Sequence, residues 1–239
     1  MVTDITNSYT SPAGKEFTLT AGRFSGISPA SNVLDLGCGY GEGICNLATE
    51  FRCKAKAIDI NAENIEDARE LSISRKVSHL IDFQTQDILE SDFSEEPADL
   101  ILAEGGVFSF IGREKGLQLA SSWLDSRGWL AFSDIVLLSE NIPNEILEIF
   151  ENKTYNYETE ASYRRLLKDN GYSTKFMCLV PPSGWDNYYA HMARRLEDDK
   201  GFFASRQIKL AFHREIDVFY RLEATKYVGY LVGIVRKEE

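Results

Sequence analysis

Short apolar runs alternate with longer amphipathic segments along most of this 239-residue chain. A short apolar run bounded by glycine or polar residues is typical of a buried strand, and apolar residues spaced three or four apart are typical of a helix that covers a sheet. The predicted strands are residues 33–36, 54–60, 80–84, 98–103, 129–137, 172–180 and 227–235. The predicted helices between them are residues 44–51, 62–74, 112–124 and 161–170. This alternation predicts an α/β fold with a doubly wound, mostly parallel sheet.

The first 30 residues stand outside the alternation. They are polar and broken, and they contain one predicted helix over Glu16–Ile27. This helix is either an ordinary N-terminal cover or a flap that closes over a ligand. Gly14 and Gly22 would give a flap its freedom of movement.

Two later segments interrupt the alternation as well. Residues 139–156 form a longer connection with an amphipathic run, and residues 182–226 contain two predicted helices, at 186–198 and 202–222. We therefore divide the chain into an N-terminal cap (1–30), a core (31–181), a helical insertion that covers the substrate (182–226) and a last core strand (227–239).

The stretch from Asn32 to Leu47 carries the most informative motif of the chain. A strand runs into glycines at every second position, which are Gly37, Gly39, Gly41 and Gly43, and a helix follows. Glycines let the backbone turn sharply near a ligand, and the free N–H groups of the new helix point at that ligand. The dinucleotide pattern Gly-x-Gly-x-x-Gly is absent, because Glu42 and Ile44 occupy the positions of its third glycine. The alternatives are a nicotinamide or flavin site and a glycine-rich turn that binds nothing.

The segment Asp35-Leu36-Gly37-Cys38-Gly39-Tyr40-Gly41 resembles motif I of the class I S-adenosylmethionine (SAM) methyltransferases, an acidic residue followed by Gly-x-Gly-x-Gly. The resemblance covers residues 32–180 and resumes at the last strand, which runs antiparallel in this family. It implies a Rossmann-like sheet of seven strands that binds SAM. The residues implied for cofactor binding here are Asp35, Gly37, Cys38, Gly39 and Gly41.

Acidic residues follow the second and third predicted strands, as they do in this family. Asp59 matches the residue that accepts hydrogen bonds from the ribose diol of SAM, and its alternative role is to cap the next helix. Asp87 matches the residue that binds the adenine amino group, and its alternative role is to stabilise a turn. Ile60 and Ile88 either enclose the purine between apolar side chains or belong to the core.

Glu104 ends the fourth predicted strand, before the pair Gly105-Gly106. Ligands of open α/β sheets bind at the carboxyl ends of the strands, so we expect Glu104 where SAM meets the substrate. It would contact the cofactor or the substrate, or act as a catalytic base; a structural carboxylate bonded to nearby backbone is the alternative. His191 is the second candidate base, because a nitrogen nucleophile must lose its proton before it attacks.

Polar aromatic residues cluster at the start of the late insertion. Trp185, Tyr188 and Tyr189 precede His191 beside a break in the pattern. They either line a substrate pocket or pack one helix against another. An insertion can vary without disturbing the cofactor site, so we expect this cluster to bear on the substrate.

Composition narrows the choice of partners. The chain has 37 acidic and 26 basic residues, a formal net charge of −11, and it lacks the Asp/Asn-Pro-Pro-aromatic motif of nucleic-acid amino-methyltransferases. Such a surface repels phosphate backbones, so we expect no nucleic acid partner. Four cysteines without Cys-x-x-Cys spacing and the lack of a signal peptide predict a cytoplasmic protein with reduced thiols. No apolar run is long enough to cross a membrane, and the three scattered histidines predict no metal site.

The leading hypothesis is a SAM-dependent methyltransferase that acts on a nitrogen, oxygen or carbon nucleophile of a small molecule. The sulfonium of SAM makes its methyl group electrophilic, so the protein mainly binds and orients the reactants. The alternatives are a non-catalytic SAM-binding or regulatory protein and a protein or peptide methyltransferase. The sequence leaves the substrate, the accepting atom and the oligomeric state open.

Overall fold

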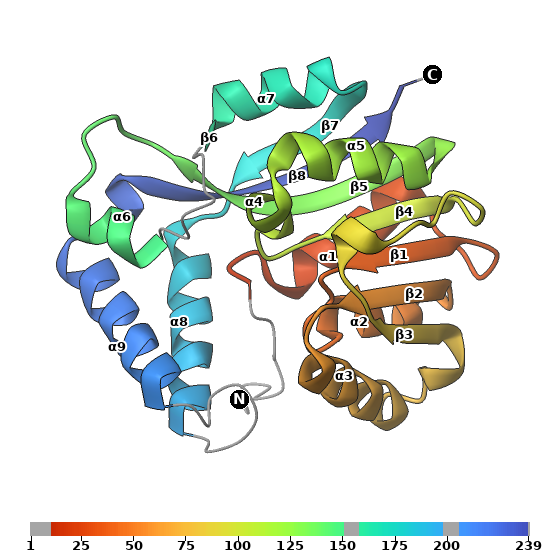
Figure 1. The fold of residues 1–239 in the computed structure, drawn as a ribbon, viewed down its shortest axis with the longest axis horizontal. Helices are drawn as coiled ribbons and strands as arrows, with labels where there is room; N and C mark the ends of the chain where they lie inside the picture. The colour runs from red at the N-terminus through yellow and green to blue at the C-terminus, as the bar shows by residue number, and fades with distance from the viewer. Residues whose placement is uncertain (1–10, 151–157, 198–205, 239) are drawn as a thin grey trace.

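The computed structural model describes residues 11–150, 158–197 and 206–238. A single sheet crosses the molecule in the order β3-β2-β1-β4-β5-β8-β7, and the short β6 pairs with β5 beside this path (Figure 1). The strands are β1 (Asn32–Leu36), β2 (Lys54–Asp59), β3 (Ile81–Thr85), β4 (Ala98–Ala103), β5 (Leu124–Leu137), β6 (Glu158–Thr159), β7 (Tyr172–Leu179) and β8 (Val228–Lys237). β8 runs antiparallel to both of its neighbours, whereas the remaining pairs are parallel. The predicted doubly wound sheet with an antiparallel last strand is therefore confirmed.

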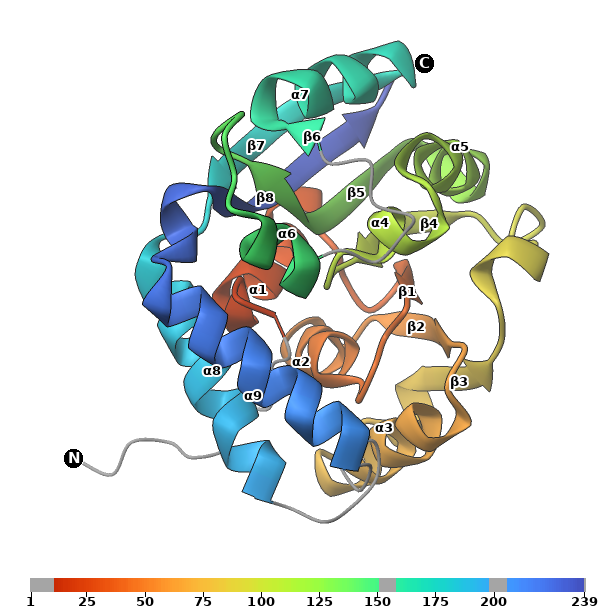
Figure 2. The same cartoon turned by 60° about the vertical axis from the view of Figure 1, so that its left-hand side comes forward.

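Helices cover both faces of this sheet. The apolar cluster on one face includes side chains of α1 (Gly14–Ser25), α2 (Glu42–Phe51), α3 (Ala62–Ser74), α6 (Asn144–Phe150), α8 (Pro182–Glu197) and α9 (Arg206–Arg221). The cluster on the other face includes α4 (Val107–Ile111), α5 (Arg113–Trp123) and α7 (Glu160–Asp169). Short 3-10 turns lie at Ser78–Leu80, Ile88–Glu90 and Ala224–Lys226. Figures 1 and 2 show α8 and α9 side by side.

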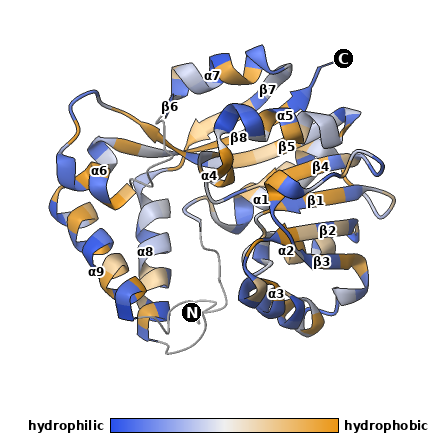
Figure 3. Ribbon diagram, viewed as in Figure 1, coloured by the Kyte–Doolittle hydropathy of each residue, from blue (hydrophilic) through white to orange (hydrophobic). Residues whose placement is uncertain are grey.

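Successive residues of a strand pack alternately into the two apolar clusters. On β1, Val33 belongs to the cluster with α1, whereas Leu34 and Leu36 belong to the cluster with α5. Figure 3 shows that the central strands are mostly apolar along their length, as expected for strands that helices cover on both faces. Burying one such leucine or valine contributes about 1.5–3 kcal/mol to stability. Among the helices that the structure describes, none combines the length and the apolar character needed to cross a membrane.

The strand order determines where a ligand can bind. The chain builds β2 and β3 on one side of β1 and then passes to β4 and β5 on the other side. The loops after β1 and β4 therefore diverge, and a crevice opens outside the carboxyl ends of these strands. The glycine-rich loop follows β1 and Glu104 follows β4, so both lie at this crevice.

Several element boundaries differ from the prediction, and the reasons are local. β5 begins at Leu124 rather than at Trp129, because Leu124 pairs with Ala98 before the register shifts. α8 begins earlier than predicted, at Pro182, since a proline fits the first turn of a helix, where its N–H would have no partner. α4 and β6 were not predicted, because each is too short to show a periodic pattern. Parts of the predicted cap and insertions, at 1–10, 151–156 and 198–205, lie outside the described residues.

Candidate functional site

A cavity of about 590 Å³ lies at the carboxyl ends of the parallel strands. Cavities of roughly 300–1,000 Å³ hold small-molecule ligands. The wall includes Asp35, Gly37, Cys38, Gly39, Tyr40, Asp59, Ile60, Asp87, Ile88, Glu104, Gly105, Val107 and Phe110. The structure thus brings together every residue that the sequence analysis assigned to the cofactor except Gly41.

The loop after β1 needs glycine for two different reasons. Gly37, Gly39 and Gly41 have φ angles of 69°, 52° and 75°, a region that other residues rarely adopt. A Cβ atom on Gly37 would lie 2.8 Å from Cγ2 of Val107, and one on Gly41 would lie 2.8 Å from Cβ of Ala68. Gly41 therefore lets α2 approach α3 closely instead of facing the cavity. α2 begins directly afterwards without a side-chain cap, so its first N–H groups can bind a ligand.

Asp59, at the end of β2, holds the glycine loop in place. Its carboxylate accepts hydrogen bonds from the N–H of Gly39 (2.8 Å), the N–H of Asn61 (2.9 Å) and Nδ2 of Asn64 (3.2 Å). The cap of α3 is Asn61, whose side chain accepts hydrogen bonds from the N–H groups of Glu63 and Asn64. Asp59 also lines the cavity, and ribose binding by this carboxylate stays a prediction.

The residues predicted for adenine line the same cavity. Asp87 follows β3, and its Oδ1 accepts a hydrogen bond from the N–H of Leu89 (2.8 Å), so it does stabilise a turn. Ile88 is 9 % exposed, whereas Ile60 is 72 % exposed, and both line the cavity. An isoleucine with so much apolar surface in water is favourably covered by a planar ring.

Two carboxyl groups, of Asp35 and Glu104, share the cavity wall. Burial, together with the nearby charges of Glu104 and Asp59, raises the pKa of Asp35 well above its usual range. Burial also raises the pKa of Glu104 to about 7, although a hydrogen bond from Thr18 Oγ1 to its Oε1 (2.8 Å) acts in the opposite direction. Neighbouring carboxylates disfavour each other's ionisation, and a cation between them removes that penalty. This part of the wall therefore suits a positively charged ligand.

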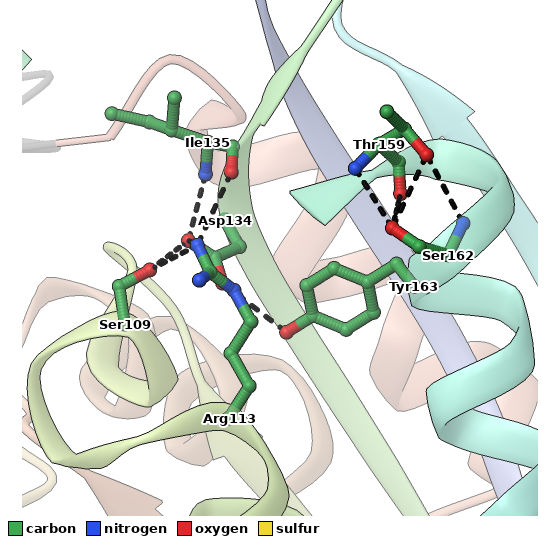
Figure 4. A network of polar contacts seen from close by, with 7 residues as sticks. All are labelled: Ser109, Arg113, Asp134, Ile135, Thr159, Ser162 and Tyr163. Atoms are coloured by element: carbon green, nitrogen blue, oxygen red, sulfur yellow. Dashed lines mark hydrogen bonds and ion pairs between the residues drawn. The ribbon is translucent and has the colours of Figure 1, made fainter. Parts of the chain in front are cut away.

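A buried ion pair that the sequence analysis missed fastens α5 and α4 to β5 (Figure 4). Arg113 Nε donates to Asp134 Oδ2 at 2.7 Å, and the two side chains are 6 % and 1 % exposed. The hydroxyls of Ser109 and Tyr163 donate to the same carboxylate, the latter at 3.2 Å. Because α4 also carries Val107 of the cavity wall, this network fixes one side of the cavity.

A second set of hydrogen bonds joins the N-terminal segment to the loop after β4. The N–H of Gly105 donates to Ser133 Oγ at 2.9 Å. The hydroxyls of Ser133 and Tyr230 lie 3.0 Å apart, and Ser11 Oγ donates to the Tyr230 hydroxyl at 3.2 Å. Residues from the beginning, middle and late parts of the chain therefore meet at one corner of the cavity, which Ser11 and Gly105 line.

Two of the predicted substrate residues lie in the core. Trp185 and Tyr189 are 3 % and 1 % exposed, and their rings pack against Phe219 of α9, with Phe150 of α6 beside Trp185. Neither side chain lines the cavity described above. Their spacing of four residues puts them on one face of α8, and that face covers other helices. For these two residues the structure favours helix packing over pocket lining.

A second cavity, of about 660 Å³, contains the other two residues of that cluster. Tyr188 and His191 line it, and Ser11 and Glu42 line both cavities. His191 is therefore not on the wall that carries Glu104. Its predicted role as a base stays a prediction that the cavity geometry does not favour.

Three residues that form contacts around the site were not predicted, and the sequence carries a signal for two of them. Asp134 and Ser133 are polar residues inside the apolar run 129–137, and that exception is a signal that could have revealed both networks. Arg195 gave no such signal on a polar face of α8. Its guanidinium lies 3.9 Å from the ring centroid of Tyr40, which holds α8 against the glycine loop.

The donor groups of the described chain do not assemble a metal centre. Within residues 11–150, 158–197 and 206–238, no three His, Cys, Asp or Glu side chains gather in a way that could hold an ion. The four cysteines are free thiols. Burial raises the pKa of Cys45 to about 12 and that of Cys53 to about 11, so both are poor nucleophiles at neutral pH.

The mostly parallel sheet, the glycine loop after β1 and the acidic cavity wall together define a Rossmann-like protein that binds a nucleotide-type cofactor. Residues 27–194 match the family model described as "Methyltransferase domain". This match spans well over half of the chain, which therefore belongs to the methyltransferase domain family. The family predicted from motif I is confirmed, and with it the cofactor that the family uses, SAM.

The relatives found by sequence are distant and longer. The sarcosine/dimethylglycine N-methyltransferase of Halorhodospira halochloris is 26 % identical over 148 residues, which are 61 % of this chain and 53 % of that protein. Phosphoethanolamine N-methyltransferase 1 of Arabidopsis thaliana is 24 % identical over 165 residues, which are 69 % of this chain and 33 % of that protein. The chain thus spans about half of the first of these relatives and about a third of the second.

A solved structure shows the same fold over the whole chain. It is a SAM-dependent methyltransferase from Thiobacillus denitrificans in complex with S-adenosyl-L-homocysteine (SAH). The two superimpose with a TM-score of 0.80 at 18 % identity, over 98 % of this chain and 95 % of that one. This likeness confirms the predicted architecture, a sheet flanked by helices on both faces.

Proposed function

We propose that this protein is a SAM-dependent methyltransferase that transfers a methyl group to the nitrogen of a small molecule. Membership of the methyltransferase domain family supports methyl transfer. The names of the relatives, sarcosine/dimethylglycine and phosphoethanolamine N-methyltransferases, support a small amine as the acceptor.

The wall of the first cavity fits the cofactor. The backbone of the glycine loop and the start of α2 would hold the methionine end of SAM. Asp59 would accept hydrogen bonds from the ribose, while Asp87, Ile60 and Ile88 would surround the adenine. When bound, SAM supplies a methyl group on a positively charged sulfur, which a nucleophile can attack without further activation of the cofactor.

The environment of Glu104 carries the proposal that the acceptor is a nitrogen. Most amines are protonated at neutral pH and cannot attack before they lose a proton. A carboxyl group with a pKa of about 7 is suited to take that proton near neutral pH. An incoming ammonium group also stabilises the ionised form of Glu104 that burial disfavours. Binding of a cationic acceptor therefore shifts Glu104 towards the carboxylate that can take the proton.

A methyl-transfer screen with Glu104→Gln tests this proposal. The protein is incubated with SAM labelled in its methyl group and a panel of small primary, secondary and tertiary amines. We expect a labelled amine from the wild type and a decrease in kcat of roughly 100-fold or more in the variant. The affinity for SAH should change by less than about threefold, which shows that the cofactor site is intact. A wild type that binds SAH but labels no amine would contradict the proposal and favour a non-catalytic SAM-binding protein.

We also propose that the protein works in the cytoplasm and without nucleic acid. The free thiols of all four cysteines support a reducing compartment. The formal net charge of −11 opposes binding to phosphate backbones.

A further inference from the structure

The second cavity has no role in the function proposed above. It lies between the start of α1, the first turn of α2 and one face of α8. Ser11 and Glu42 belong to its wall and to the wall of the first cavity, so the two cavities adjoin. A molecule that occupies the second cavity can therefore extend towards the site of methyl transfer.

Basic side chains gather around this second cavity, although the protein as a whole is acidic. Lys15, Arg75 and Arg194 line it, together with the carboxylates of Glu16 and Glu42. Arg75 forms an ion pair with Glu42, with 2.8 Å between Nη2 of Arg75 and Oε2 of Glu42. Lys15 and Arg194, by contrast, have no hydrogen-bond or ion-pair partner among the described residues. Apart from this ion pair, the cavity wall carries two cations, Lys15 and Arg194, and one carboxylate, that of Glu16.

The cavity wall also presents hydrogen-bond donors without acceptors. α1 begins at Gly14 without a side-chain cap, and the N–H of Gly14 donates to the carbonyl oxygen of Ser11 at 3.2 Å, so the N–H groups left for a ligand in its first turn are those of Lys15 and Glu16. Nε2 of His191 is buried and has no hydrogen-bond partner among the described residues. In the tautomer that carries its proton on Nε2, this atom is a donor without an acceptor, and an anion that reaches it would complete the bond.

Tight packing between remote segments builds this wall. Gly184 of α8 lies so close to the N-terminal segment that a Cβ atom there would be 2.6 Å from the carbonyl oxygen of Pro12. Ser11 is held from the other side by the hydroxyl of Tyr230. The start of α1 is therefore fixed beside α8, and Lys15 and Arg194 line one cavity although they lie far apart in the sequence.

We propose that the second cavity binds an anionic group, a phosphate or a carboxylate, of the methyl acceptor while the amine of the same molecule extends past Ser11 to Glu104. This inference rests on the proposed function, and it makes the acceptor a small amine with a negative charge at its other end. The carboxylate of SAM itself is the competing occupant.

NMR of the histidine side chains tests the anion site directly. The protein, saturated with SAH, is titrated with inorganic phosphate and separately with acetate, and the imidazole signals of His79, His191 and His213 are followed. We expect a saturable shift of the His191 signal alone. This signal is assigned as the one that is missing from the spectrum of His191→Gln. Arg194→Gln should weaken the binding by about tenfold, as loss of a charge-assisted hydrogen bond does. Arg165→Gln removes the same charge from α7 and should change nothing.

Each result then supports or overturns the proposal. Tighter binding of phosphate than of acetate points to a phosphate monoester, and the reverse points to a carboxylate. Equal, unsaturable shifts of all three histidines would mean adventitious ions and overturn the proposal. A tenfold loss of SAH affinity in Arg194→Gln would assign the cavity to the carboxylate of the cofactor and overturn it too.

The methyl-transfer assay separates this inference from the proposed function. Amines are compared in pairs, with and without an anionic group, such as phosphoethanolamine and ethanolamine. We expect the anionic member of an accepted pair to have a kcat/KM at least tenfold higher, and Arg194→Gln to abolish that advantage. Equal use of both members would overturn the anion site and leave the methyltransferase standing. If no amine accepts a methyl group, the proposed function itself fails.

Discussion

Ionisation of Glu104 should lower the free energy of unfolding as the pH rises, and Glu104→Gln should remove this effect. Burial raises the pKa of Glu104 from its usual 4.5 to about 7. A difference of this size corresponds to about 3 kcal/mol in the free energy of unfolding once the group is ionised in both states. Glu104 is half-buried at a cavity open to solvent. Screening by water lowers this change in the free energy of unfolding, so we expect roughly 1–3 kcal/mol.

The sign of the effect follows from the order in which the two states lose the proton. Below pH 4.5, Glu104 is protonated in both the folded and the unfolded protein and costs nothing. Between pH 4.5 and about 7 the unfolded protein releases the proton while the folded protein keeps it, so each increase in pH favours unfolding. Above about pH 7 both states are ionised, and the penalty is complete. Glutamine has nearly the same shape and never ionises, so the advantage of the variant grows across this window.

Urea unfolding of the ligand-free protein at pH 4.5 and pH 8 measures the effect. At pH 8 the variant should be more stable than the wild type by roughly 1–3 kcal/mol, and at pH 4.5 the two should agree within about 0.5 kcal/mol. Thr18→Val is the matched control, because it removes the hydrogen bond that favours the carboxylate and should lower stability at pH 8. Equal stability of wild type and Glu104→Gln at both pH values would refute the argument from burial.

Three further substitutions test other parts of the site. Asp59→Ala should weaken SAH binding by roughly 1–3 kcal/mol in calorimetry, and unchanged affinity in a folded variant would restrict Asp59 to its structural bonds. Gly41→Ala should lower the free energy of unfolding by about 1–3 kcal/mol, because φ is 75° and the new methyl group meets Ala68; a neutral result in urea unfolding would mean that the loop rearranges at no cost. Asp134→Asn should cost about 3–5 kcal/mol, since it leaves Arg113 buried without its counter-ion; a loss under 1 kcal/mol by the same measurement would show that the pair is dispensable.

The cavity at the strand ends could be predicted because its signals are local. The glycine spacing around Gly37 and the acidic residues after β2 and β3 each lie within a few residues of a strand end. In a doubly wound sheet those strand ends meet at one edge, so the topology brings Asp59, Asp87 and Glu104 together without further information. The cavity wall contains all three.

The second cavity could not be predicted in the same way, because it depends on contacts between remote segments. The apolar stripe of α8 gave no sign that Trp185 and Tyr189 would turn towards α9 instead of towards a cavity. Whether an aromatic side chain lines a pocket or fills the core depends on what packs against it, and that partner lies elsewhere in the sequence. Lys15 and Arg194 come to line one cavity only because the start of α1 docks on α8.

The position of β8 has a consequence for the synthesis of the protein. β8 lies between β5 and β7, although it follows both of them along the chain. A ribosome therefore releases β7 long before the strand that connects it to the sheet, and residues 180–227 must emerge in between. Until then the facing edges of β5 and β7 are unpaired, and such edges readily pair with other chains. Nascent chains stopped after residue 227 should therefore sediment as aggregates or bind chaperones, whereas chains released after residue 237 should stay in the supernatant.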